Sequence, residues 1–473
     1  MARGTVAVLP HARGIMQIEC NVFRTPQASG LALSVLLGSR PDGGTRVAFS
    51  LGRRRTIAWK SMHTFSFILL FSQEFAMSQT PCPVELELPP MADVVLVDNL
   101  EEFQQYRLAW KSLLEETPRA SFFMTFDWLE TAWKHFGTKQ EHRGAKHTRR
   151  GDQHDYRVLV VRSDKKPIGF VPLCVVNEQH RVGRVRTLTY PLASWDAWYG
   201  PIGPNQAACH WLATQFLAEQ RRDWDIVDLR WLDPQQTSTF SLIAAMKAMD
   251  MPVLAEPYQE SSVIDFDGTW EDYLQTRSSK QRHEMRRKLR HAEELPQVEF
   301  IRHRPLSAAE GDGDPRWDLF DTCRDLAARS WQGDSMSGNT ISHPQVTEFL
   351  HECHAAAARR GMLDVTLLKV AGQPVAYGYN YHYHGKIAGL RMGYAPEFRK
   401  QGVGTGLLLM SLRDSFERGD TCLDLGVGGY GFKHRYRTKL EQSYRYTHYP
   451  ASAWKSQGVR LTKWLKRRVA MSL

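Results

Sequence analysis

Residues 399–405 read Arg-Lys-Gln-Gly-Val-Gly-Thr, an R-x-x-G-x-G pattern between an apolar strand segment and an apolar helix segment. Gly402 and Gly404 let the backbone approach a ligand closely and adopt turn geometries that a side chain would obstruct. The amides of residues 402–405 would lie unpaired at the N-terminus of the following helix, where the helix dipole also favours an anion. The segment therefore predicts a pyrophosphate-binding loop, and a structural turn without a ligand is the alternative.

The segments around this loop alternate between strands and helices. Residues 365–370, 374–383 and 386–394 are predicted strands joined by glycine-containing turns, and residues 421–425 form another strand after the helix. Ahead of them, residues 271–295, 317–331 and 344–360 have helical spacing, and the first of these segments is long and strongly basic. Residues 91–260 repeat the alternation without a glycine-rich loop, so we expect a second α/β unit there.

The overall composition leaves several classes of protein and partner open. The 473 residues allow two or three domains, and 42% hydrophobic with 24% charged residues is ordinary for a globular protein. The net charge of +10 predicts attraction to anionic partners. Nucleotide cofactors, lipid headgroups, acidic polymers and nucleic acid all qualify, so charge alone does not choose among them.

The cysteines and the apolar segments point to a cytoplasmic chain. Seven dispersed cysteines without a C-x-x-C pair argue against a disulfide framework and a zinc site. No stretch reaches the roughly 20 apolar residues that span a bilayer. Residues 1–90 lack periodicity and precede two candidate starts, Met77 and Met91, so we expect a disordered or wrongly assigned extension.

Three local matches carry a resemblance to a known family. They are Ser330-Trp331-Gln332-Gly333, which is similar to an S-W-K-G motif, the loop at 399–404, and Lys433 after the following strand. With the strand–loop–helix–strand order, they resemble the GNAT acetyltransferase superfamily over residues 92–450. Within it, the chain is similar to FemAB-like proteins and to the acetyltransferase-like group called "cellulose biosynthesis protein CelD".

The resemblance implies an α/β fold of tandem GNAT-like domains with mixed β-sheets flanked by helices. The expected divisions are residues 1–90 as the extension, 91–260 as a degenerate copy, 261–450 as the acyl-CoA-binding copy and 451–473 as a basic tail. A backbone amide of residues 390–393, displaced by a β-bulge, would polarise the acyl carbonyl. The residues expected at the cofactor are Arg391, Met392, Gly393, Arg399, Lys400, Gln401, Gly402, Val403, Gly404 and Thr405.

The same resemblance implies the catalytic side chains. A tyrosine beyond the last core strand would protonate the leaving thiolate, and Tyr430 and Tyr436 are both available. Asp424 is the preferred base or substrate anchor, with Glu397 as the alternative. An acidic pair usual in the family is missing, because Gly429 and Tyr430 follow Gly428.

The remaining candidates concern the acceptor and anionic partners. Trp331, Lys433 and Arg435 are expected to contact the acceptor, and no metal site is expected. The basic helix at 271–295 and the tail at 455–468 would be either solvated faces or contacts with anionic surfaces. The tail combines Leu461, Trp464 and Leu465 with cations, which fits an anionic membrane or a packed terminal helix equally well.

The sequence thus favours an N-acyltransferase that moves an acyl group from acetyl-CoA, or another acyl-CoA, to an amine. The resemblance suggests a cell-envelope or polysaccharide precursor as acceptor, in the cytoplasm or at the inner membrane face, without sequence-specific nucleic acid binding. One alternative is a FemAB-like transferase that takes its donor from aminoacyl-tRNA. Another is a non-catalytic accessory protein of exopolysaccharide or cellulose biosynthesis.

Overall fold

The computed structural model describes residues 88–137, 154–191, 198–330, 333, 340–428 and 431–471, together with five strands before residue 60. The chain divides into two units, Met1–Cys82 and Pro83–Leu473. The first unit contains an antiparallel sheet in the order β1-β2-β3-β4-β5. Its strands are β1 (Val6–Pro10), β2 (Ile15–Cys20), β3 (Leu33–Ser39), β4 (Thr45–Leu51) and β5 (Ile57–Trp59).

The second unit begins with strands and helices in alternation. Its N-terminal half comprises β6 (Ala92–Val97), α2 (Leu100–Gln104), α3 (Arg107–Glu115), η1 (Phe122–Met124), α4 (Phe126–Phe136), β7 (His154–Ser163), β8 (Lys166–His180), β9 (Gly183–Thr189), α5 (Gln206–Glu219), β10 (Ile226–Leu232) and α6 (Thr237–Ala248). Strands β6 to β9 form a meander, and β10 joins β9 in parallel after α5.

The C-terminal half starts with a long strand and ends with a helix. It comprises β11 (Val253–Asp265), α7 (Trp270–Gln275), α8 (Ser279–Glu293), β12 (Glu299–His303), η2 (Ala308–Glu310), α9 (Trp317–Arg329), α10 (Thr347–Arg359), β13 (Leu363–Val370), β14 (Gln373–Tyr383), β15 (Lys386–Tyr394), η3 (Pro396–Gln401), α11 (Val403–Arg418), β16 (Cys422–Val427), α12 (Lys433–Tyr436), β17 (Lys439–His448) and α13 (Trp454–Met471). Among the described residues, no helix is both long and apolar enough to cross a membrane.

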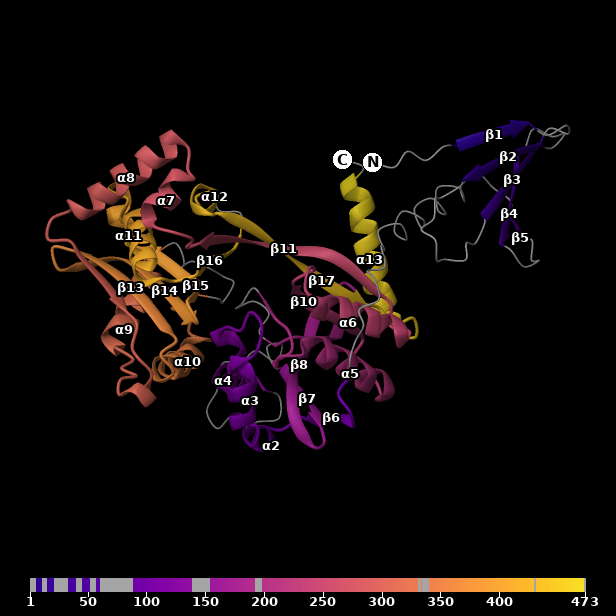
Figure 1. The fold of residues 1–473 in the computed structure, drawn as a ribbon, viewed down its shortest axis with the longest axis horizontal. Helices are drawn as coiled ribbons and strands as arrows, with labels where there is room; N and C mark the ends of the chain where they lie inside the picture. The colour runs from indigo at the N-terminus through magenta and orange to yellow at the C-terminus, as the bar shows by residue number, and fades with distance from the viewer. Residues whose placement is uncertain are drawn as a thin grey trace. The chain divides into compact units, whose positions relative to one another are not determined.

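One twelve-stranded mixed sheet runs through the whole second unit. Its order is β12-β13-β14-β15-β16-β11-β17-β10-β9-β8-β7-β6. Strand β17 lies between β11 and β10, and β11 pairs with both β16 and β17 (Figure 1). These two long strands therefore join the halves. The predicted α/β fold, a mixed sheet flanked by helices, is confirmed.

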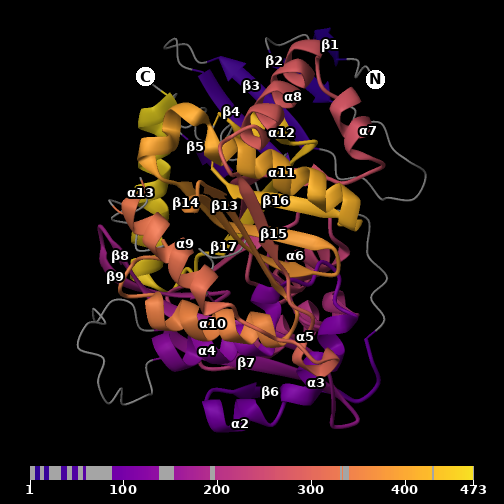
Figure 2. The same cartoon turned by 90° about the vertical axis from the view of Figure 1, so that its left-hand side faces the viewer.

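Aromatic side chains from both halves share one core. The Phe122 ring lies 4.2 Å from that of Tyr381 in β14, and the Trp128 ring in α4 lies 4.9 Å from that of Phe349 in α10, between ring centroids. Helices α4 and α10 pack side by side (Figure 2). Burial of large rings is a major source of packing energy, so this contact binds the halves together.

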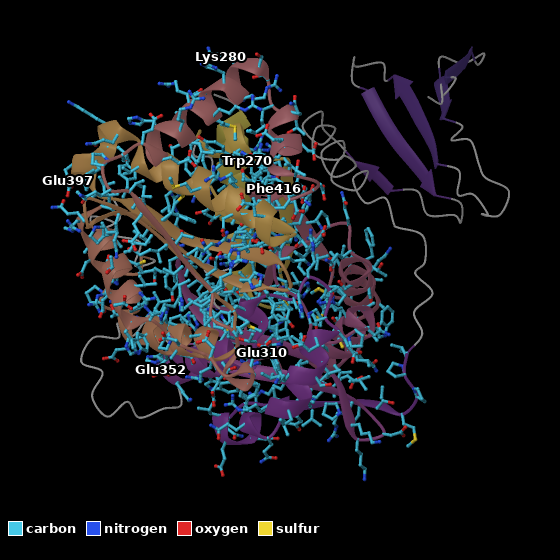
Figure 3. All side chains as sticks on the ribbon, turned by 60° about the vertical axis from the view of Figure 1, so that its left-hand side comes forward. Trp270, Lys280, Glu310, Glu352, Glu397 and Phe416 are labelled. Atoms are coloured by element: carbon cyan, nitrogen blue, oxygen red, sulfur yellow. The ribbon has the colours of Figure 1, made fainter. Side chains whose placement is uncertain are left out.

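The basic segment at 271–295 forms two helices rather than the single predicted one. Helix α7 ends at Gln275 and α8 begins at Ser279. Ser278 caps α8 through its side chain, and Gln281 completes a capping box. In α7, Trp270 lies beside Phe416 of α11 (Figure 3), with 6.0 Å between ring centroids. The break therefore lets α7 and α8 each pack on α11.

Candidate active site

The R-x-x-G-x-G segment folds as a turn followed by a helix, as predicted. The short helix η3 ends at Gln401, Gly402 adopts a left-handed conformation with φ of 67°, and α11 begins at Val403. A Cβ atom on Gly402 would meet no atom within 4 Å. Glycine is therefore needed at this position for its backbone conformation rather than for space.

The amides at the start of α11 are only partly available. The N–H of Gly402 donates to the carbonyl of Arg399 at 3.2 Å, and that of Thr405 donates to the carbonyl of Gly402 at 3.0 Å. The expectation that residues 402–405 all present unpaired amides is therefore wrong for these two. Among the described residues, Val403 and Gly404 make no backbone hydrogen bond through their N–H groups. An anion at this helix end would find these two donors beside the exposed side chains of Arg399 and Lys400.

Two further glycines are fixed by close contacts. A Cβ on Gly404 would lie 2.8 Å from Cδ1 of Tyr394, and a Cβ on Gly393 would lie 2.6 Å from Cε1 of Tyr377. Gly393 therefore makes room for the Tyr377 ring. The β-bulge expected within residues 390–393 is present in β15.

Strand β15 carries a bulge and separates from β16 next to it. The register of β14 and β15 shifts between the pairs Tyr379↔Arg391 and Asn380↔Gly389, so Leu390 is the extra residue. Strands β15 and β16 run in parallel only as far as the pair Ala388↔Asp424. Within the described strands, residues 389–394 thus have no ladder partner on the β16 side. The two strands are still in contact at Gly389, where an added Cβ would lie 2.7 Å from the carbonyl oxygen of Asp424.

Asp424 lies where the two strands part. The Ser261 hydroxyl donates a hydrogen bond to its Oδ1, and the Gly426 N–H donates to the same oxygen at 2.7 Å. Burial raises the pKa of this carboxyl above its usual value, against these two donors, and the charge of Glu441 adds to the rise. A carboxyl with a raised pKa is a stronger base near neutral pH than an ordinary aspartate.

Ser261, Glu441 and Arg119 are site residues that the sequence analysis did not find. Ser261 of β11 is paired with Glu441 of β17, which places their side chains on one face of the sheet, next to Asp424. Arg119 of the N-terminal half donates to Asp233 at 2.8 Å and to Glu441 at 3.1 Å. Arg119 and Glu441 are 322 residues apart. No local motif could have joined them.

Lys433 is buried, with 6% of its surface exposed. Its ammonium group donates to the carbonyl oxygens of Gly426 and Val427, each at 2.8 Å. Burial lowers the pKa of Lys433 to about 8, the nearby Arg391 lowers it further, and Asp424 opposes the change. In this position Lys433 fixes the end of β16 beside Asp424. Arg435, by contrast, is exposed and lies 3.6 Å from Glu284 of α8.

Tyr436 lies against the predicted cofactor loop. It is buried, and its carbonyl oxygen accepts a hydrogen bond from the Tyr273 hydroxyl at 2.6 Å. Burial raises its pKa, so the phenol is protonated at neutral pH. Tyr430 and Trp331 lie outside the described residues.

Other carboxylates and histidines lie apart from this centre. Glu397 points outward (Figure 3), with 57% of its side chain exposed and Arg329 at 3.7 Å. His382 lies 3.7 Å from Asp420, whereas His384 lies 2.9 Å from Glu115. In the part of the chain that the structure describes, no group of three or more His, Cys, Asp or Glu residues is arranged to hold a metal ion.

A family model of known proteins matches part of the C-terminal half. Residues 279–434 match the family model of the acetyltransferase (GNAT) domain, a range that contains the loop, Asp424 and Lys433. Comparison with curated proteins found no match.

Solved structures show a weaker likeness. FemX has 10% identity and a TM-score of 0.47, over 72% of this chain and 95% of FemX. A tandem GNAT protein from the clavulanic acid biosynthesis pathway has 12% identity and a TM-score of 0.38, over 76% and 99%. A GCN5-related N-acetyltransferase from Sphaerobacter thermophilus has 13% identity and a TM-score of 0.30, over 76% and 96%. These scores lie below 0.5, so the likeness to a known family depends on the family model, whose match is confined to residues 279–434.

Proposed function

We propose that this protein is an N-acyltransferase that moves an acyl group from acyl-CoA, in the first place acetyl-CoA, to an amine. The observation that carries the proposal is the end of the β15–β16 ladder at Ala388 and Asp424. It leaves the rest of β15, up to the glycine loop, without a ladder partner on that side. A thioester donor needs an anion site for its pyrophosphate and a channel for its acyl arm. The loop would provide the anion site, and the segment of β15 without a ladder partner would border the acyl arm.

The donor would be held by backbone and cationic groups together. The pyrophosphate would accept hydrogen bonds from the Val403 and Gly404 amides, with Arg399, Lys400, Gln401 and neighbouring loop residues around it. The acyl arm would lie along Arg391, Met392 and Gly393 of β15. A backbone amide beside the bulge would stabilise the negative charge that develops on the carbonyl oxygen.

The side chains would move two protons. Asp424 would accept a proton from the attacking amine as the nitrogen–carbon bond forms. The carbon–sulfur bond then breaks, and the leaving thiolate would take a proton from a tyrosine phenol. Tyr436 is the described candidate, because its raised pKa keeps it protonated, and Tyr430 is the second.

The acceptor side would be built by both halves of the second unit. Asp424 and Glu441 place carboxylates on one face of the sheet, and Arg119 brings the N-terminal half to the same place. Carboxylates favour a cationic amine. We propose an amine of a cell-envelope or polysaccharide precursor, with Trp331, Lys433 and Arg435 on the acceptor side and no sequence-specific nucleic acid partner. The activity would be cytoplasmic, at the inner face of the membrane.

Calorimetric titration of the full chain with acetyl-CoA tests the donor. Arg399→Glu/Lys400→Glu reverses two exposed charges at the loop, and Lys111→Glu/Lys247→Glu reverses two exposed charges elsewhere. We expect micromolar binding that the loop variant loses and the control variant keeps. Failure of the folded wild-type chain to bind acetyl-CoA and other acyl-CoAs would overturn the proposal.

A tRNA-dependent transferase is the second candidate, and α8 is the observation that favours it. The helix carries six Lys or Arg residues, and Lys280 projects at its outer end (Figure 3). Its phosphate-binding capacity would suit an aminoacyl-tRNA donor. Micromolar tRNA binding without acyl-CoA binding would favour this candidate. Binding of neither donor would leave an accessory role, in keeping with the missing acidic pair.

A further inference from the structure

The C-terminal helix α13 has an unusual composition. It carries six cationic residues and no Asp or Glu over Trp454–Met471. The cations are Lys455, Arg460, Lys463, Lys466, Arg467 and Arg468. A surface helix of a globular protein ordinarily mixes both signs of charge, so this helix presents a strong positive potential.

One face of α13 is fixed to the second unit. Ser456 and Val459 on this face are buried. Gly458, on the stripe between Trp454 and Leu461, also meets the second unit, since a Cβ there would lie 2.6 Å from the Val182 side chain. Lys455 and Lys463 lie 3.9 Å and 3.8 Å from the acidic groups of Asp225 and Glu256. The helix is therefore held in place by packing and by part of its charge.

The opposite face of α13 exposes large apolar side chains. Trp454 is 71% exposed, Leu461 56% and Leu465 49%, and Trp464 beside them is 37% exposed. Positions 454, 461 and 465 fall on one stripe of a helix with 3.6 residues per turn. Isolated exposed apolar residues are common on proteins, but a stripe of them usually marks an interaction surface.

The side chains around this stripe indicate which kind of partner binds to it. Arg460 and Lys466 are exposed, and the described residues form no ion pair with either. The Arg468 guanidinium lies 4.4 Å from the centre of the Trp464 ring. Tryptophan and leucine flanked by Lys and Arg are typical of a helix that lies in the headgroup layer of an anionic membrane. A nucleic acid would use the cations but would leave the leucines in water.

We propose that the outward face of α13 binds anionic lipid headgroups and lies parallel to the membrane surface. Trp454, Leu461, Trp464 and Leu465 would enter the interface, while Arg460 and Lys466 would contact lipid phosphates. This deepens the proposed function by giving the partner that holds the protein at the membrane. It does not depend on acyl transfer, so a chain that bound lipid but no acyl-CoA would support this inference and reject that function.

Co-flotation of the full chain with vesicles tests the inference. The vesicles contain phosphatidylcholine alone or equal parts of phosphatidylcholine and phosphatidylglycerol. One variant, Leu461→Ser/Leu465→Ser, removes the stripe, with exposed Leu108→Ser as its control. The other, Arg460→Gln/Lys466→Gln, removes two cations, with exposed Lys111→Gln/Lys247→Gln as a control of equal net charge. Thermal unfolding and circular dichroism check that each variant is folded.

We expect binding to the anionic vesicles and little to phosphatidylcholine. Loss of two cations should weaken binding roughly 30-fold, from about 1 kcal/mol for each basic residue near a charged surface. Loss of the two leucines should weaken it roughly tenfold or more, and neither control should change it. No binding by the wild-type chain, or equal loss in variants and controls, would overturn the inference. So would binding that only the cation variant loses and that short RNA displaces, because that pattern describes a polyanion site.

Discussion

Gly404→Ala is the most direct test of the cofactor loop, because the added methyl group is small and its neighbour is known. Its Cβ would lie 2.8 Å from Cδ1 of Tyr394, whereas ordinary contact begins at 3.4 Å. The ring and the start of α11 must therefore separate by about 0.6 Å, and overpacking of this kind costs about 1–3 kcal/mol. The same shift moves the amides of Val403 and Gly404 away from a bound phosphate.

The affinity for acetyl-CoA should fall with this displacement. Hydrogen bonds to a charged group contribute about 1.5–3 kcal/mol, so weakening one of them lowers affinity roughly tenfold or more. Gly406→Ala is the matched control, because its Cβ would lie 2.5 Å from Cβ of Ala292 on α8, away from the loop amides. Both variants should lower the unfolding temperature, but only Gly404→Ala should also weaken acetyl-CoA binding strongly.

Isothermal titration and thermal unfolding together show whether Gly404 serves ligand binding or only the stability of the fold. Gly402→Ala provides a third case, since its cost of about 1–2 kcal/mol comes from the left-handed backbone alone. If Gly404→Ala loses stability and still binds acetyl-CoA as the wild type does, the loop is a structural turn. The reasoning from its amides would then be refuted.

Three further predictions concern residues outside the loop. Asp424→Asn should lower kcat about 10²-fold or more if Asp424 is the base. The pKa of Asp424 is higher in the folded state than in the unfolded state, so the stability of the wild-type protein falls as pH rises from near 3.9 through the folded-state pKa. The unfolding temperature of Asp424→Asn should not show this fall with pH. Asp364→Asn removes a fully buried partner of Arg302 and should cost about 3–5 kcal/mol of unfolding free energy, measured in urea. Arg119→Met cuts the contact with Glu441, so the KM for the acceptor should rise while acetyl-CoA affinity stays the same.

Elements with strong local signals could be predicted from the sequence. The loop, α11 and the meander of β13, β14 and β15 follow from glycine positions, helical spacing and turn residues. The break between α7 and α8 was missed, although α7 has no cation and no apolar residue lies between Leu274 and Met285. The Ser278-x-x-Gln281 capping box was the available signal.

The catalytic face was less predictable because its residues meet only in the folded chain. Asp424 could be named from its place in a strand, but its hydrogen bond with Ser261 depends on the pairing of β11 with β16. Glu441 lies in β17, a strand that the sequence analysis did not predict. Residues 439–448 alternate weakly between polar and apolar types, and their pairing with β10 and β11 decides their conformation.

The position of β17 also changes what the N-terminal half contributes. A degenerate copy attached by a linker could be removed without loss to the cofactor site, but here β17 is bonded on one edge to β10 and on the other to β11. Glu441 in this strand receives Arg119 from the N-terminal half and faces Ser261 and Asp424. Loss of the N-terminal half would therefore expose an unpaired strand edge and remove Arg119 from Glu441, which would keep only Lys439 at 3.2 Å. The chemistry and the N-terminal half belong to one continuous sheet, which gives a physical reason for a chain to keep a half that has no phosphate loop of its own.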